Sequence, residues 1–188
     1  MRTFVLYARK AKTDSTFNIN DLPSEGRMDL VCRCISSCMF LSYKKRENVR
    51  LYVVLNGPPK APITLCFTEK SNFYPDERSI AKLIKKILSS KITKEWKEKD
   101  GILVAKKSFQ ELIKELEGNF YVLHERGKVV NNIKENPIFI LGDNRGIPKN
   151  EEKKVLRKGE KLSLGKNRYL ASSCISVLHW LCDQYEIN

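Results

Sequence analysis

The chain has 188 residues, of which 41% are hydrophobic and 30% are charged, a composition that is typical of a folded globule and excludes a disordered or fibrous chain. Its 35 lysines and arginines exceed its 22 aspartates and glutamates, leaving a formal net charge of +13; this favours a polyanionic partner such as RNA, although a lysine-rich surface without such a partner has the same count. The longest apolar runs are far shorter than the roughly 20 residues that cross a bilayer, and Arg9 and Lys10 interrupt the first one before a secretory signal is complete, so we expect a cytoplasmic protein without a membrane segment.

The hydrophobic pattern predicts alternating strands and helices. Runs of β-branched and aromatic residues predict the strands, and apolar residues at three- and four-residue spacing predict the helices. In chain order we expect a strand at residues 2–8, a helix at 27–42, strands at 50–55 and 64–67, a helix at 75–88, a strand at 101–105, a helix at 108–117, strands at 119–123, 137–141 and 161–164, and a helix at 169–185. This order indicates an α/β fold with a mainly parallel sheet covered by helices on both faces, in which ligands bind outside the carboxyl ends of the strands.

Three consecutive predicted strands end in polar, glycine-containing loops, at residues 123–127, 141–146 and 164–169. If these strands are parallel neighbours, their loops meet in one crevice, and the glycines let a ligand approach the backbone closely. Ordinary turns between strands and helices have a similar composition, and that alternative stays open. The sequence has no GxxxxGK[ST] loop, no GxGxxG after a strand and no GxSxG, which argues against P-loop, Rossmann dinucleotide and serine-hydrolase sites.

The six cysteines include no CxxC pair, and only His124 and His179 could add imidazole ligands. Because a structural zinc site usually has ligands paired at short spacing, we expect no metal and mostly buried cysteines. Cys174 lies on the apolar stripe of the last predicted helix, where packing is favoured over a role as nucleophile. One disulfide remains an open alternative.

Four motifs follow one another along the chain: Gly-Arg-Met-Asp-Leu at residues 26–30, Pro-Asp-Glu-Arg-Ser at 75–79, Leu-Gly-Asp at 141–143, and Ser-Leu-Gly at 163–165 followed by Tyr-Leu-Ala-Ser at 169–172. Each motif alone is weak, but together they closely resemble the archaeal tRNA pseudouridine(54) N1-methyltransferases, the TrmY family of the SPOUT superfamily. The resemblance extends from the first predicted strand to the final helix.

This resemblance implies a single SPOUT domain over residues 1–188, with a mainly parallel sheet flanked by helices. It also implies that a cofactor-binding region at about residues 118–188 forms a trefoil knot, and that two subunits pair through their knotted regions. Since protein chains ordinarily avoid knots, the knot rests wholly on the resemblance. The homodimer has the same basis.

In that superfamily S-adenosyl-L-methionine (SAM) binds among the three loops of the knot, largely through backbone groups. Carried over to this sequence, the resemblance implies that the cofactor contacts are Leu123, His124, Leu141, Gly142, Asp143, Ser163, Leu164, Gly165, Leu170 and Cys174. The residues that the resemblance selects therefore lie in or beside the same three loops that the strand pattern selects.

The implied reaction transfers the SAM methyl group to N1 of pseudouridine 54 in tRNA. Since N1 becomes a good nucleophile only as its proton leaves, the reaction needs a proton acceptor and a cation near the ring. Asp29 and Asp76 are the candidate carboxylates, and Arg27 and Arg78 are the candidate cations; each pair lies at or near the start of a predicted helix, where anions also bind. The alternative is that each aspartate only caps its helix and each arginine is only solvated.

Three other functions remain as alternatives: N1-methylation of pseudouridine in ribosomal RNA, 2'-O-methylation of ribose, and binding of RNA by charge alone without catalysis. The motifs fit the tRNA group better than the ribosomal group. A ring N–H suits Arg27 and Asp29 better than a ribose hydroxyl does. Binding of SAM separates all three enzymes from the binding module.

Overall fold

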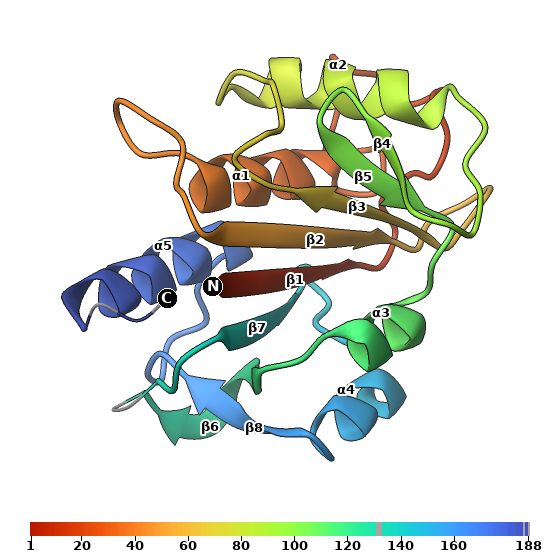
Figure 1. Ribbon diagram of the computed structural model, residues 1–188. Helices are drawn as coiled ribbons and strands as arrows, with labels where there is room; N and C mark the ends of the chain where they lie inside the picture. Colours follow the sequence, from red (N-terminus) through yellow and green to blue (C-terminus); the bar gives the residue numbers. More distant parts are fainter. Residues whose placement is uncertain (131–132, 186, 188) are drawn as a thin grey trace.

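The computed structural model describes residues 1–130, 133–185 and 187 (Figure 1). Its helices and strands are β1 (Arg2–Ala8), α1 (Met28–Met39), β2 (Val49–Leu55), β3 (Ile63–Phe67), α2 (Glu77–Leu88), β4 (Lys97–Lys99), β5 (Ile102–Ala105), α3 (Phe109–Glu115), β6 (Asn119–Val129), β7 (Pro137–Gly142), α4 (Lys149–Val155), β8 (Gly159–Ser163) and α5 (Ala171–Gln184). The prediction of an α/β fold is confirmed. The short elements β4 and α4 were not predicted, because a strand of three residues and a charged helix of seven leave no clear apolar period.

The eight strands of the described residues form one sheet in the order β4-β5-β3-β2-β1-β7-β6-β8. The pairs β1–β2, β1–β7, β6–β7 and β6–β8 are parallel, whereas β3, β4 and β5 add an antiparallel edge. The short connection between β2 and β3 contains Asn56, Gly57 and three prolines, and it is too short for the crossover that a parallel pair needs. The sheet is therefore mainly parallel, as predicted.

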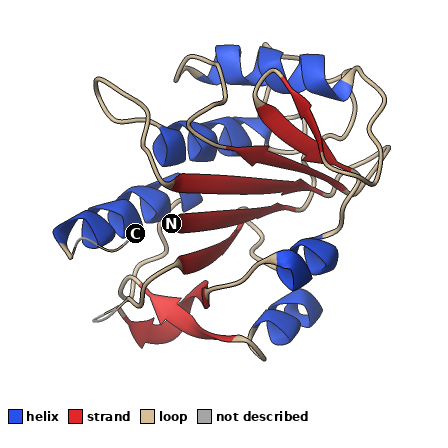
Figure 2. Ribbon diagram, in the orientation of Figure 1, coloured by secondary structure: helices blue, strands red, loops and turns tan. Residues whose placement is uncertain are grey.

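Helices cover both faces of the sheet, with α1, α2 and α5 on one face and α3 and α4 on the other (Figure 2). Alternate residues of the central strand β1 serve the two layers: Phe4 packs toward α1 and α5, and Val5 packs toward α3. Because β1 is buried on both faces, its sequence is an unbroken apolar run from Phe4 to Leu6 rather than an alternating one.

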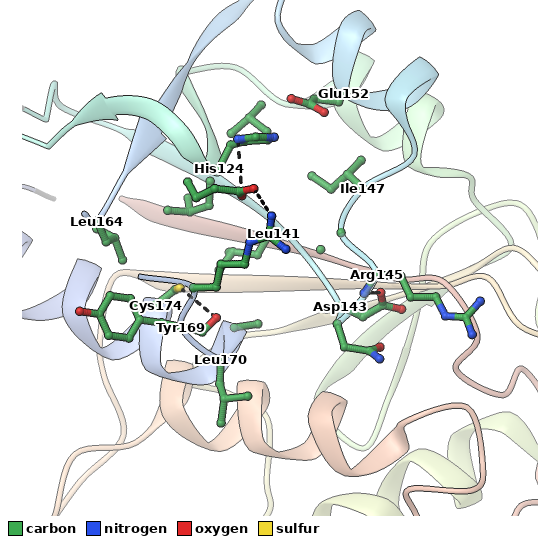
Figure 3. A pocket seen from close by; sticks show the side chains of 18 of the residues that line it. His124, Leu141, Asp143, Arg145, Ile147, Glu152, Leu164, Tyr169, Leu170 and Cys174 are labelled. Carbon is green, nitrogen blue, oxygen red and sulfur yellow. Dashed lines mark hydrogen bonds and ion pairs between the residues drawn. The ribbon is translucent and has the colours of Figure 1, made fainter. Parts of the chain in front are cut away.

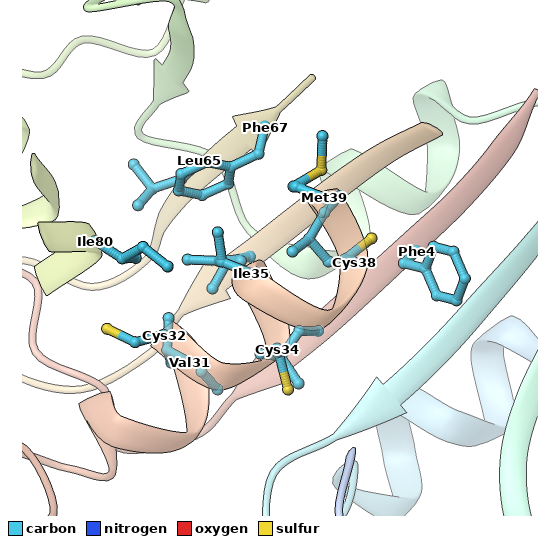
Figure 4. Close-up of a cluster of buried hydrophobic side chains, with 14 of the residues drawn as sticks. Phe4, Val31, Cys32, Cys34, Ile35, Cys38, Met39, Leu65, Phe67 and Ile80 are labelled. Carbon is cyan, nitrogen blue, oxygen red and sulfur yellow. The ribbon is translucent and has the colours of Figure 1, made fainter. Parts of the chain in front are cut away.

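Helix α1 is the centre of the larger core, because it packs against the sheet, α2 and α5. Ile35 and Met39 lie on the side of α1 that faces β3 and α2 (Figure 4). Cys32, Cys34 and Cys38 fill the remaining space as small apolar side chains, and burial raises the pKa of the Cys34 thiol to about 12. All six cysteines are free, so the alternative of a disulfide does not hold in this structure.

The last three strands are neighbours in the sheet, but in the order β7-β6-β8 rather than in chain order. Strand β6 continues to Val129 instead of ending at Leu123 as predicted, because residues 124–127 bulge out between two pairs with the same residue of β8: Leu123 and Lys128 both lie opposite Leu162. Gly127 permits this bulge, since a Cβ there would lie 2.7 Å from the backbone carbonyl carbon of Leu162. After β8, the chain returns as α5 to pack on α1.

None of the helices in the described part of the chain is long and apolar enough to cross a membrane. Within residues 1–130, 133–185 and 187, no group of three or more His, Cys, Asp or Glu side chains is placed to hold a metal ion. The trefoil knot stays a prediction from the resemblance.

Candidate functional site

A cavity of about 690 Å³ lies where the carboxyl ends of β6, β7 and β8 meet the start of α1 and the start of α5 (Figure 3). The three predicted loops form its walls, because β6 lies between β7 and β8 in a parallel arrangement. Its volume is within the range of sites that hold a small-molecule ligand. The prediction that the three loops meet in one crevice is confirmed.

The loop after β7 is held by Asp143. The Asp143 backbone N–H donates to the Tyr7 carbonyl oxygen (3.1 Å), and the Asp143 carboxylate accepts backbone N–H bonds from Arg9 (2.7 Å) and Arg145 (2.9 Å). Gly142 lies just before it, and a Cβ at Gly142 would be only 2.4 Å from the Gly146 backbone. This loop is therefore folded tightly on itself and tied to the end of β1.

The bulge in β6 supplies the second wall. Within it, His124 Nδ1 accepts a hydrogen bond from the Arg126 backbone N–H (3.0 Å). Glu125 forms an ion pair with Arg168, which lies in the third loop, at 2.6 Å. Two of the three walls are thus joined by one exposed ion pair across the cavity.

The third loop, after β8, is ordered by Ser163. The Ser163 hydroxyl accepts a hydrogen bond from the Gly165 N–H (3.1 Å) and donates one to the Gly165 carbonyl (2.9 Å). Gly165 has a φ of 114°, a value that favours glycine, and a Cβ built there would meet no atom within 4 Å. Ser163 itself is only 2% exposed and lies beneath the cavity wall.

Nine of the ten residues that the resemblance implies as cofactor contacts line the cavity; Ser163 is the exception. The nine are Leu123, His124, Leu141, Gly142, Asp143, Leu164, Gly165, Leu170 and Cys174. Cys174 is half-buried, and burial raises the pKa of its thiol, which does not favour a nucleophile. The structure brings the residues together, and their contact with SAM stays a prediction.

Of the four candidate catalytic residues, only Arg27 lines the cavity. Its guanidinium donates from Nε and Nη2 to the two carboxylate oxygens of Asp29, at 2.9 and 3.0 Å. Asp29 is only 4% exposed. Although burial opposes ionisation of Asp29, hydrogen bonds from Arg27 and Arg33 outweigh this effect and lower its pKa to about 2. Asp29 is therefore ionised and paired, with weak basicity.

Asp76 and Arg78 lie at the start of α2 and are not among the residues that line the cavity. The Asp76 carboxylate accepts a hydrogen bond from the Ser79 backbone N–H at 2.8 Å, which makes Asp76 the N-cap of α2. Both side chains are exposed. Helix α2 nevertheless reaches α1 near Arg27, because Glu77 contacts Arg33 at 3.5 Å.

Four cationic residues of the cavity were not among the predicted cofactor contacts or catalytic residues, namely Arg9, Arg145, Lys149 and Arg168, although Arg145 and Arg168 lie in the predicted loops. Arg9 follows β1, and its buried Nε has no hydrogen-bond partner among the described residues. The position of Arg9 beside the cavity could have been predicted, because Arg9 follows the carboxyl end of β1, which pairs with β7. Lys149 lies outside the predicted loops, and its place at the cavity depends on how the chain after β7 folds back.

The residues that line this cavity fit SAM. Leu123, Leu141 and Leu164 offer apolar surface for an adenine ring, and the open space at Gly165 leaves its backbone accessible. The arginines that line the cavity could pair with the carboxylate of the methionine part of SAM, and the carboxylates of Asp143 and Glu125 could pair with its ammonium group. A mainly parallel α/β sheet with such a cavity at the carboxyl ends of its strands is typical of proteins that bind a nucleotide or a nucleoside-containing cofactor.

The particular family follows from comparison with known proteins. The family model described as "Putative SAM-dependent RNA methyltransferase" matches residues 1–187, and the chain belongs to this family. The chain is 40% identical to the tRNA (pseudouridine(54)-N(1))-methyltransferase of Methanococcus aeolicus, over 100% of both chains. It is 39% identical to the protein of the same name from Methanocaldococcus jannaschii, over 100% of this chain and 98% of that protein.

Among solved structures, the fold is similar to Archaeoglobus fulgidus Nep1 bound to S-adenosylhomocysteine. The TM-score is 0.67, with 12% sequence identity, and the match covers 99% of this chain and 98% of that one. At this identity the likeness concerns the fold alone, and it agrees with the architecture expected from the resemblance.

Proposed function

We propose that this protein transfers a methyl group from SAM to N1 of pseudouridine at position 54 of tRNA. The observation that carries the proposal is the full-length similarity to archaeal enzymes of that name. The cavity supports it, because its walls are the loops that the resemblance selects for the cofactor. SAM, when bound, supplies the methyl group on its sulfonium. A tRNA substrate also accounts for the net charge of +13 and fits a cytoplasmic enzyme.

Arg27 is the residue that we propose to face the pseudouridine. It borders the cavity, and Asp29 holds only its Nε and Nη2, so its remaining N–H groups are available to a ring oxygen or a flanking phosphate. Such a cation stabilises the negative charge that grows on the ring as the N1 proton leaves. Methyl transfer itself depends mainly on in-line positioning of the two reactants.

Asp29 and Asp76 remain the proposed carboxylates for the N1 proton. The low pKa of Asp29 makes it a weak base, and Asp76 needs a substrate that reaches α2. We expect Asp29→Asn and Asp76→Asn to keep SAM binding and at least one to slow turnover substantially. If both variants turn over at the wild-type rate, neither aspartate is the base, and water or a phosphate takes the proton.

The enzyme activity is tested with two sets of tRNA transcripts, one carrying pseudouridine at position 54 and one carrying uridine. After incubation with SAM, nucleoside mass spectrometry should detect N1-methylpseudouridine only in the first set. Methylation of the uridine transcripts contradicts the proposal. A ribosomal RNA fragment with pseudouridine tests the ribosomal alternative, and calorimetry with millimolar SAM tests the non-catalytic binding module, which should give no heat.

We further propose that the protein is a homodimer that pairs through the outer face of α5. Its inner face packs on α1, but Leu170, Val177 and Trp180 are 61%, 38% and 59% exposed on the other side, and an exposed apolar row of this kind marks an interaction surface. Leu170 also lines the cavity, so a partner there would cover the cavity mouth. Light scattering after size exclusion should find a dimer that Trp180→Glu dissociates and the control Leu103→Glu, on β5, leaves intact.

The single-domain SPOUT architecture over residues 1–188, with a knot at about 118–188, also belongs to the proposal. The single eight-stranded sheet supports the single domain. A crystal structure traced through this region tests the knot.

A further inference from the structure

Four charged side chains form a continuous row that runs from the cavity to α2. Arg27 contacts Asp29 through two hydrogen bonds, Arg33 donates from Nη2 to Asp29 Oδ2 at 2.6 Å, and Arg33 Nη1 lies 3.5 Å from Glu77 Oε1. Arg27 borders the cavity, whereas Arg33 is one helical turn beyond Asp29 and is not among the cavity residues. The row links the motif at residues 26–30 to the motif at residues 75–79.

Both arginines share one buried acceptor. The Asp29 side chain is 6% exposed, whereas those of Arg27 and Arg33 are 36% and 35% exposed. Asp29 Oδ2 accepts from both guanidinium groups, and its bond from Arg33 is shorter than its bond from Arg27 at 3.0 Å. Without Arg33, one face of this carboxylate loses its strongest donor, and the carboxylate can turn away from Arg27. Glu77 in turn balances the second positive charge and fixes Arg33 from the side of α2.

The backbone at Arg27 shows that its position is constrained. Arg27 has φ 68° and ψ 40°, in the left-handed region that is unfavourable for a residue with a Cβ. Such a conformation persists only where the surroundings determine it. The forked hydrogen bonds to Asp29 are part of these surroundings, since they fix the guanidinium plane as well as its charge.

We propose that Arg33 is a positioning residue for the methyl transfer: through Asp29 it holds the Arg27 guanidinium in the orientation that faces the pseudouridine. This inference rests on the proposed function. Arg33 contacts neither cofactor nor substrate, and its effect passes through the shared carboxylate. Glu77 supports Arg33 in that role and so connects the motif at residues 75–79 with the motif at residues 26–30.

A double-mutant cycle tests the inference, with Arg33→Met, Arg27→Met and the double variant measured in methylation of tRNA that carries pseudouridine 54. We expect Arg33→Met to lower kcat by about 10²-fold, the loss typical of a displaced group, with the KM for tRNA and the Kd for SAM almost unchanged. Because Arg33 acts through Arg27, the double variant should be no slower than Arg27→Met within about threefold. The inference is overturned if the losses of kcat in the two single variants multiply in the double variant. It is also overturned if Arg33→Met keeps its kcat, or if its loss is confined to the KM for tRNA or the Kd for SAM.

The matched control is Lys107→Met, which removes an ion pair with Glu115 on the opposite face of the sheet; the Lys107 side chain is 12% exposed. It should lose thermal stability about as Arg33→Met does and keep its kcat. If it loses kcat equally, general destabilisation accounts for both effects and the inference fails.

A readout without turnover separates this inference from the proposed function. The Arg27 Nε–H signal in ¹H–¹⁵N spectra, assigned by its absence in Arg27→Met, should be sharp in the unchanged chain and broadened or shifted in Arg33→Met. If the unchanged chain methylates no RNA, the proposed function fails, while this signal still decides whether Arg33 positions Arg27. An identical Arg27 signal in both proteins overturns the inference.

Discussion

Replacement of Gly142 by alanine is the most direct test of how the cavity is built. Gly142 ends β7, and the loop that follows it turns back so closely that a Cβ would lie 2.4 Å from Gly146 C, 2.5 Å from Gly146 Cα and 2.6 Å from Ile147 N. All three are backbone atoms, so no side-chain rotation can relieve the contact. The segment from Gly142 to Ile147 must move as a unit, and with it a wall of the cavity.

The size of the effect follows from this overlap. Forcing one additional carbon into a well-packed site costs about 1–3 kcal/mol, and for a chain of this length each kcal/mol lowers the melting temperature by about 2–4 °C. We therefore expect Gly142→Ala to melt roughly 2–12 °C lower. Because the displaced segment lines the cavity, the Kd for SAM should rise at least about tenfold, which corresponds to about 1.4 kcal/mol.

Differential scanning fluorimetry and calorimetric titration with SAM measure the two effects. Gly146→Asn is the control for stability: Gly146 has a φ of 68°, which asparagine tolerates, and no atom lies within 4 Å of a Cβ there. The control should melt within about 2 °C of the unchanged protein. A Gly142→Ala protein with an unchanged melting temperature and an unchanged Kd for SAM would refute the close packing of this loop.

Three further predictions concern titration, the ion pair across the cavity and thiol reactivity. The folded-state pKa of Asp29 is about 2 against an ordinary value of 3.8, so its ionised form stabilises the protein above pH 4 by about 2 kcal/mol, and this contribution is lost as the pH falls through 2. In urea unfolding, the stability difference between the wild-type protein and Asp29→Asn should therefore shrink between pH 4 and pH 2. A constant difference contradicts the pairing. Arg168→Met removes the exposed ion pair with Glu125, so the affinity for SAM should fall a few-fold at low salt, and the difference from the wild-type protein should vanish at 1 M NaCl. A difference that persists at high salt indicates a direct contact between Arg168 and SAM instead. Cys174 lines the cavity, whereas the other five cysteines are buried. Mass spectrometry should therefore find that iodoacetamide modifies Cys174 alone and that SAM slows this modification. Labelling at the same rate with and without SAM argues against cofactor binding beside Cys174.

Much of the fold was predictable because its signals are local. Among the described residues, the β-branched runs and the three- and four-residue periods predicted eleven of the thirteen elements, and all of these except β6 agree within three residues at each end. The glycine-bearing loops after the last three predicted strands indicated the cavity. What the local pattern missed has a physical reason. Strand β6 continues past Leu123 because Lys128 pairs with the same residue of β8 as Leu123 does. Pairing with a distant strand does not produce a recognisable pattern in the local sequence.

The two candidate aspartates show the same division most clearly. Asp29 and Asp76 occur in similar local contexts, each near the start of a helix and two residues from an arginine, so the local pattern identifies both equally as candidate anions. Only the packing of the folded chain distinguishes them: Asp29 is buried between two guanidinium groups, whereas Asp76 is an exposed cap. Burial depends on which distant segments pack over a residue, and here α2 packs against α1, with Glu77 in contact with Arg33 beside Asp29. No local period encodes such a contact between residues far apart in sequence.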